Sequence, residues 1–156
     1  MKKIKYESAL VTFTEVPDEI SLCFNITGCP CHCEGCFEPW LWEDYGTELT
    51  YAVLEAEIAK HPHITCVCFL GGDGRYEELS ELLREMREKR PDLKLAMYSG
   101  IPGVVELVGQ YLDYYKIGPY DPKCGPLNNK TTNQKFFKRE DGQWIDITYR
   151  FQKEEN

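Results

Sequence analysis

The stretch ISLCFNITGCPCHCEGCF, residues 20–37, joins an apolar run to a cysteine-rich loop. The run from Ile20 to Ile26 predicts a buried β-strand. Directly after it, four cysteines crowd into a short segment, at Cys29, Cys31, Cys33 and Cys36. Because cysteine thiolates are the ligands of iron-sulfur clusters and of many zinc sites, the stretch predicts a metal centre at the end of a strand.

Further strands and helices alternate along the rest of the chain. Apolar runs predict strands at Ile64–Leu70, Leu93–Tyr98 and Tyr114–Ile117, with a closing strand at Trp144–Phe151. Helical periodicity predicts helices at Leu49–Lys60, Tyr76–Arg90 and Pro102–Tyr111. Thr50 is expected to cap the first helix, and Pro91 to stop the second. This alternation predicts one α/β domain over residues 1–156, with parallel strands whose carboxyl ends carry the chemistry.

Composition and charge exclude several classes of function. The formal net charge is −8, from 18 Lys and Arg against 26 Asp and Glu, so direct nucleic-acid binding is not expected. No apolar run approaches the ~20 residues of a membrane helix, and no secretory signal follows the basic amino terminus. We therefore expect a cytoplasmic protein without a membrane partner, in which cysteines stay reduced and available for metal binding.

The spacing of the loop cysteines leaves more than one metal site open. Ligation as Cys29-x3-Cys33-x2-Cys36 would leave one iron of a four-iron cube without a protein ligand, free to accept the amino and carboxylate groups of a substrate. A structural zinc site would instead need a fourth ligand, from Cys31, His32 or Cys124. A closed four-cysteine cluster would only transfer electrons.

The remaining cysteines carry no predicted chemistry. Cys23, Cys66 and Cys68 lie within apolar strands, where a free thiol packs as a small hydrophobic group. Cys124 lies in a loop rich in Pro and Gly and is assigned no role.

A Cys-x3-Cys-x2-Cys loop after a first strand resembles the signature of radical S-adenosylmethionine (SAM) enzymes. More narrowly, the chain is similar to the activating protein of anaerobic (class III) ribonucleoside-triphosphate reductase. The similarity includes the small size, Gly35 and Phe37 on either side of Cys36, Gly71-Gly72-Asp73, and Tyr98-Ser99-Gly100. It implies a single-domain, incomplete (β/α) barrel of radical SAM type, with mostly parallel strands.

The resemblance selects Cys29, Cys33 and Cys36 as the ligands of one [4Fe-4S] cluster and names no further catalytic residue. It implies that the loop around Gly35, Cys36 and Phe37 packs on the adenine of SAM.

The resemblance also places SAM contacts at the ends of the later strands. Gly71 and Gly72 would bring their backbone to the methionine amino group, and a side chain at Gly72 would obstruct that approach. Asp73 stands where the family has glutamate, with a carboxylate one methylene shorter. Tyr98, Ser99 and Lys116 would approach the sulfonium, ribose or carboxylate.

The implied function is that of an activase. An external one-electron donor such as flavodoxin or ferredoxin would reduce the cluster, and SAM cleavage would give methionine and a 5′-deoxyadenosyl radical that removes hydrogen from a partner's glycine. The implied partner is the large catalytic subunit of the anaerobic ribonucleotide reductase, while formation of a homodimer is left open. The alternatives are an activase of another glycyl-radical enzyme, such as pyruvate formate-lyase, and a non-catalytic iron-sulfur or zinc module.

Overall fold

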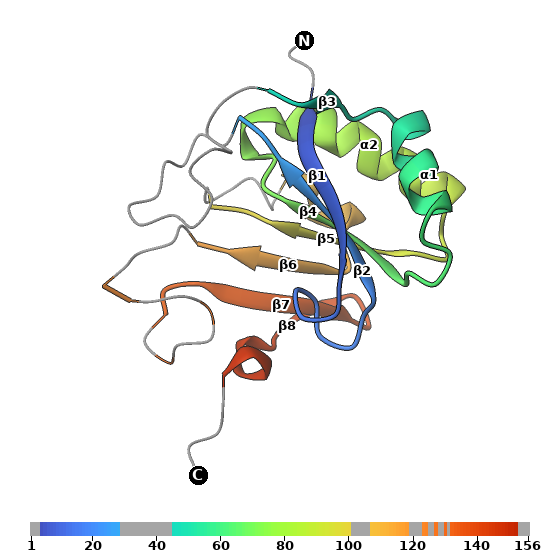
Figure 1. The fold of residues 1–156 in the computed structure, drawn as a ribbon. Helices are drawn as coiled ribbons and strands as arrows, with labels where there is room; N and C mark the ends of the chain where they lie inside the picture. The colour runs from blue at the N-terminus through green and yellow to red at the C-terminus, as the bar shows by residue number, and fades with distance from the viewer. Residues whose placement is uncertain are drawn as a thin grey trace.

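The computed structural model describes residues 4–28, 45–100, 107–118, 123–124, 127, 130 and 132–152. These residues include eight strands of one sheet, in the order β3-β1-β2-β4-β5-β6-β7-β8 (Figure 1). The strands are β1 Lys5–Thr12, β2 Ser21–Ile26, β3 Thr47–Glu48, β4 Cys66–Leu70, β5 Lys94–Tyr98, β6 Tyr114–Ile117, β7 Lys135–Glu140 and β8 Gln143–Asp146.

The centre of the sheet consists of four parallel strands, β2, β4, β5 and β6. Each lies within a stretch that the sequence predicts as a strand. Nearly continuous apolar composition is typical of parallel strands buried on both faces, which explains why these four were predictable. The flanking pairings are antiparallel, so the described sheet is mixed instead of mostly parallel. The radical SAM barrel stays a prediction.

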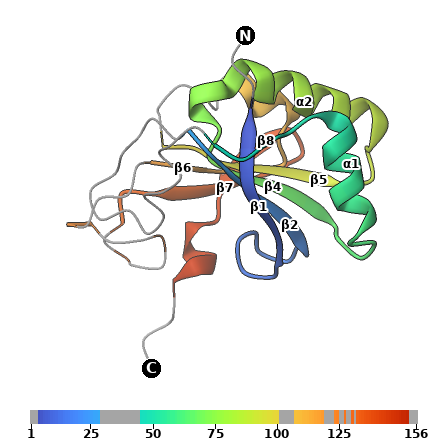
Figure 2. The same cartoon turned by 45° about the horizontal axis from the view of Figure 1, so that its top comes forward.

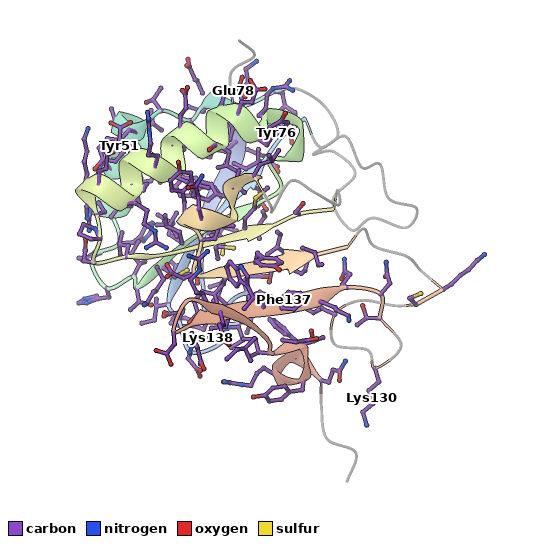
Figure 3. All side chains as sticks on the ribbon, turned by 180° about the vertical axis from the view of Figure 1, so that it is seen from behind. Tyr51, Tyr76, Glu78, Lys130, Phe137 and Lys138 are labelled. Atoms are coloured by element: carbon purple, nitrogen blue, oxygen red, sulfur yellow. The ribbon has the colours of Figure 1, made fainter. Side chains whose placement is uncertain are left out.

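Two α-helices cover one face of the sheet (Figure 2). Helix α1, Tyr51–Ala59, begins after Thr50, whose Oγ1 accepts a hydrogen bond from the Val53 amide at 3.2 Å, as the sequence predicts for a cap. Helix α2, Tyr76–Lys89, ends before Pro91. Seen from behind, Tyr51 and Tyr76 mark the two helices and Phe137 marks β7 (Figure 3). Among the described residues, no helix is long and apolar enough to cross a membrane.

The apolar periodicity of the helices forms the core with the inner strands. Leu54 and Ile58 of α1 are buried, and α2 buries a stripe at helical spacing, Leu79, Leu82, Leu83 and Met86. Of the expected helix Pro102–Tyr111, residues 101–106 lie outside the described residues. Leu107 and Val108 are helical, and a 3₁₀ turn, η3, follows at Gly109–Tyr111.

The antiparallel strands are the part of the sheet that the sequence analysis missed. In β1, charged Lys5 and Glu7 interrupt the apolar pattern. Strand β7 reaches β8 through a two-residue hairpin at Asp141 and Gly142, whose φ angles of 51° and 77° are both positive. Asp-Gly is the preferred pair for such a type I′ turn, so these two residues were the signal that could have revealed β7.

The expected closing strand Trp144–Phe151 is wrong in its second half. Strand β8 ends at Asp146, whose Oδ1 accepts a hydrogen bond from the Thr148 amide at 2.9 Å. This local side-chain bond turns the chain into a 3₁₀ helix, η4, at Thr148–Phe151. Arg150 then pairs with Asp18 at 2.7 Å, which ties η4 to the turn after β1.

Replacing Gly46 with alanine should destabilise the protein more than replacing Gly142. Both glycines have positive φ, 105° and 77°, so alanine at either costs roughly 1–2 kcal/mol of backbone strain. A Cβ at Gly46 would lie 2.3 Å from the Tyr6 carbonyl oxygen, whereas nothing lies within 4 Å of one at Gly142. We expect Gly46→Ala to cost about 1–3 kcal/mol more, measured by urea unfolding. Equal losses in the two variants would contradict the packing of Gly46 on β1.

Candidate iron-sulfur and ligand site

The cysteine loop departs from the sheet and returns to it at one place. The Thr27 amide donates to the Lys5 carbonyl at 3.0 Å, and Thr27 Oγ1 donates to the Tyr45 carbonyl at 2.5 Å. The two ends of segment 29–44 are therefore held beside the carboxyl end of β2. The predicted cluster residues themselves lie within that segment, outside the described residues, and comprise Cys29, Cys31, Cys33, Gly35, Cys36 and Phe37.

The loops after the other parallel strands begin at the same edge of the sheet. The Gly71 amide donates to the Tyr98 carbonyl at 3.1 Å, and the Ser99 amide donates to the Lys116 carbonyl at 2.8 Å. A Cβ at Gly71 would lie 3.4 Å from the Ile26 carbonyl oxygen, so Gly71 also adjoins the end of β2. The structure thus brings Gly71, Tyr98, Ser99 and Lys116 to the edge of the sheet at which the cysteine loop starts.

Gly72 is required by the fold itself. Its φ is 104°, and it begins the 3₁₀ turn η2, Asp73–Arg75. A Cβ at Gly72 would lie 2.9 Å from Leu79 Cδ2, in the core on the helix side of the sheet. The sequence analysis expects a side chain here to obstruct SAM, but in the structure it would first displace Leu79. The side chain of Asp73 lies outside the described part, so its contact with SAM stays a prediction.

Arg75 is a basic residue at this edge that the sequence analysis missed. Its Nη2 lies 3.7 Å from the position that a Cβ would take on Gly28, the residue before Cys29. Its Nη1 donates to the Gly74 carbonyl at 2.8 Å. A positive charge therefore lies at the entrance of the cysteine loop, where it favours the anionic form of nearby thiols and carboxyl groups.

Tyr98 presents its ring, not a free hydroxyl, to the neighbouring strand. The hydroxyl lies 2.6 Å from the Glu15 carbonyl oxygen and 3.0 Å from Glu15 Oε2. Burial above all raises the pKa of Tyr98 well above its ordinary value, so the phenol stays protonated. Lys116 Nζ lies 4.5 Å from the centre of the ring, in a cation–π contact. Ser99 is buried, with 2% of its surface exposed.

The described sheet cysteines lie on the face opposite the helices. Cys23 and Cys68 are register partners on β2 and β4, and Cys66 lies two residues before Cys68. All three are buried, which confirms the expectation of core thiols. Burial raises the pKa of Cys66 and Cys68, and a protonated thiol does not bind metal. In the part of the chain that the structure describes, no group of three or more His, Cys, Asp or Glu could hold a metal ion.

The comparison with known families shows the class, an iron-sulfur protein. The family model for the 4Fe-4S single cluster domain matches residues 20–108, more than half of the chain, and the chain belongs to this family. The match begins one residue before β2 and spans the cysteine loop, Gly71, Gly72 and β5. The protein therefore carries a [4Fe-4S] cluster as its cofactor. No curated protein matches the chain.

The loop cysteines are the candidate ligands of the cluster within the family match. Cys124 lies outside the family match, and Cys23, Cys66 and Cys68 are buried in the sheet. The loop contributes four cysteines, and this donor set suits an iron-sulfur cluster.

Cluster content should depend on the loop cysteines and not on the sheet cysteines. The unmodified protein should contain roughly four iron and four sulfide per chain, the content of one [4Fe-4S] cluster. We expect Cys29→Ala, Cys33→Ala and Cys36→Ala each to abolish this content, and Cys31→Ala to keep it. Cys68→Ala is the matched control, because it removes a buried thiol and should leave iron unchanged. The measurement is iron and sulfide analysis after anaerobic purification. Stoichiometric zinc without iron, or loss of iron in the control, would contradict this assignment.

Proposed function

We propose that this chain is a radical SAM activase, which cleaves SAM reductively at its cluster and generates a glycyl radical on anaerobic ribonucleoside-triphosphate reductase. The observation that carries the proposal is the convergence of strand ends on one edge. There the cysteine loop starts beside Gly71, and Tyr98, Ser99 and Lys116 follow along the same edge on the next two strands. Membership of a single-cluster family supports the cofactor, and the spacing of the loop cysteines supports an iron with an open position.

The thiolates of the chain would bind three of the four irons of the cluster and leave the fourth without a protein ligand. Cys29, Cys33 and Cys36 would hold three irons, which leaves the fourth for the amino and carboxylate groups of SAM. When bound and reduced, the cluster together with SAM supplies a 5′-deoxyadenosyl radical that can take hydrogen from glycine. The protein's own task is to place the reactants and to exclude water.

Residues at the edge are suited to that placement. Gly71, with a φ of 104° and no side chain, lets a ligand approach its backbone closely. The Lys116 ammonium, above the Tyr98 ring, would donate hydrogen bonds to the ribose of SAM near the ends of β5 and β6. Arg75 would attract an anionic group at the entrance of the cysteine loop.

The proposal extends to the fold and the partners. Residues 1–156 would form one radical SAM domain, an incomplete (β/α) barrel in which β2, β4, β5 and β6 are the parallel wall and α1 and α2 its outer layer. A short chain would leave the inner face open to a loop of the reductase's large catalytic subunit, so that the substrate itself shields the radical. Flavodoxin or ferredoxin would supply the electron in the cytoplasm.

Reduced protein mixed with SAM and the reductase should give a glycyl radical. We expect methionine and 5′-deoxyadenosine by chromatography, and an electron paramagnetic resonance doublet that collapses when the partner glycine is deuterated at Cα. Cys33→Ala should give neither product nor doublet, and it is the control for adventitious reduction.

The outcomes separate the alternatives. A doublet on pyruvate formate-lyase but not on the reductase would reassign the partner and keep the activase. An intact cluster that reduces reversibly without cleaving SAM would indicate an electron-transfer module and overturn the proposal.

A further inference from the structure

One row of side chains crosses the face of the sheet opposite the helices. Register pairing aligns Ser8, Asn25, Leu70, Tyr98 and Lys116 on successive strands. Asn25 lies two residues after Cys23 on β2 and therefore shares its face. The row lies directly below the edge from which the cysteine loop starts.

Asn25 holds an unpaired polar atom in this row. It is 8% exposed, its Nδ2 donates to Ser8 Oγ at 2.8 Å, and its Oδ1 is buried without a hydrogen-bond partner. Rotating the amide by 180° would exchange its ends but still leave one unpaired, because the Ser8 hydroxyl meets only one of them. Buried polar atoms in folded proteins are nearly always paired, so this one points to a group that binds there.

We propose that Asn25 Oδ1 accepts a hydrogen bond from an N–H or O–H group of SAM bound on this face, an inference that rests on the proposed function. SAM carries such donors on its ammonium, adenine amino group and ribose. The depth of Asn25 suits a small molecule better than a protein surface, because more than nine-tenths of the residue is covered.

The rest of the row suits the remainder of that ligand. Lys116 lies three strands from Asn25, roughly 14 Å at about 4.8 Å per strand, a span comparable with an extended nucleoside bearing an amino-acid tail. Leu70 and the Tyr98 ring lie between them and supply apolar surface. The row therefore pairs a hydrogen-bond acceptor at one end with a cation at the other.

Asn25→Leu tests the inference, since leucine is similar in size and removes the unpaired oxygen. Binding of SAM to the anaerobic, oxidised, cluster-loaded protein is measured by equilibrium dialysis, so that no turnover occurs. We expect affinity to fall about tenfold or more. The unfolding midpoint should change little, because the loss of an unpaired buried oxygen offsets the loss of the hydrogen bond from Nδ2 to Ser8. Asn25→Asp, which keeps an acceptor oxygen, should retain SAM binding.

Ser21→Ala is the matched control. Ser21 is also a buried polar residue of β2, but its hydroxyl has the Cys66 thiol as a hydrogen-bonding neighbour and it lies at the opposite end of the strand. Its removal should leave the SAM affinity unchanged.

Iron content is measured first in every variant, and Asn25→Ala replaces the leucine variant if the latter loses its cluster. Unchanged SAM affinity in either variant, with the cluster intact, overturns the role of Asn25 and leaves the proposed function standing. A fully loaded wild-type protein that does not bind SAM overturns both.

Discussion

The in-register pairing of β2 with β4 is the constraint on which the rest of the structure depends. Cys23 pairs with Cys68, Phe24 with Phe69 and Asn25 with Leu70. A slip of one residue would move every side chain of β2 to the opposite face, because successive residues of a strand alternate. It would bury Asn25 against the helices and expose Phe24. The same pairing, continued through β5 and β6, fixes the edge at which all four loops begin.

Both faces of the sheet carry buried apolar clusters, but they differ in polar content. On the helix face, Phe24 stacks on Phe69 with ring centres 5.9 Å apart, and Tyr6 meets Phe24 edge-on at 5.3 Å. Packing of this kind supplies the stability of the domain. The opposite face has a buried apolar cluster of its own, which includes Tyr114 and Phe136, but it also includes Asn25, whose unpaired Oδ1 lowers stability. A polar group that lowers stability is expected where a protein also binds a ligand, as proposed for Asn25.

The sequence allowed the centre of the fold to be predicted, but not its margins. Strands β2 and β4 are continuous apolar runs, and Thr50 is a recognisable cap, so both signals are local. Strand β1 was missed because Lys5 and Glu7 break its apolar pattern. For the site, Gly71, Ser99 and Lys116 could be placed at one edge because parallel strands end together. Asn25 could not, since a single polar residue in an apolar run reveals neither its face nor its unpaired oxygen.

Two cationic side chains lie at the candidate site, although the net charge of the chain is negative. The formal charge is −8, yet Arg75 and Lys116 are cationic groups at the edge that carries the cysteine loop. Arg75 adjoins the start of that loop, and Lys116 lies three strands away across the row from Asn25. At physiological ionic strength, exposed charges more than about 8 Å apart are largely screened, so distant acidic groups contribute little here. An anionic group beside Arg75 or beside Lys116 therefore experiences a favourable local potential, and the acidic composition of the chain does not oppose an anionic ligand at this edge.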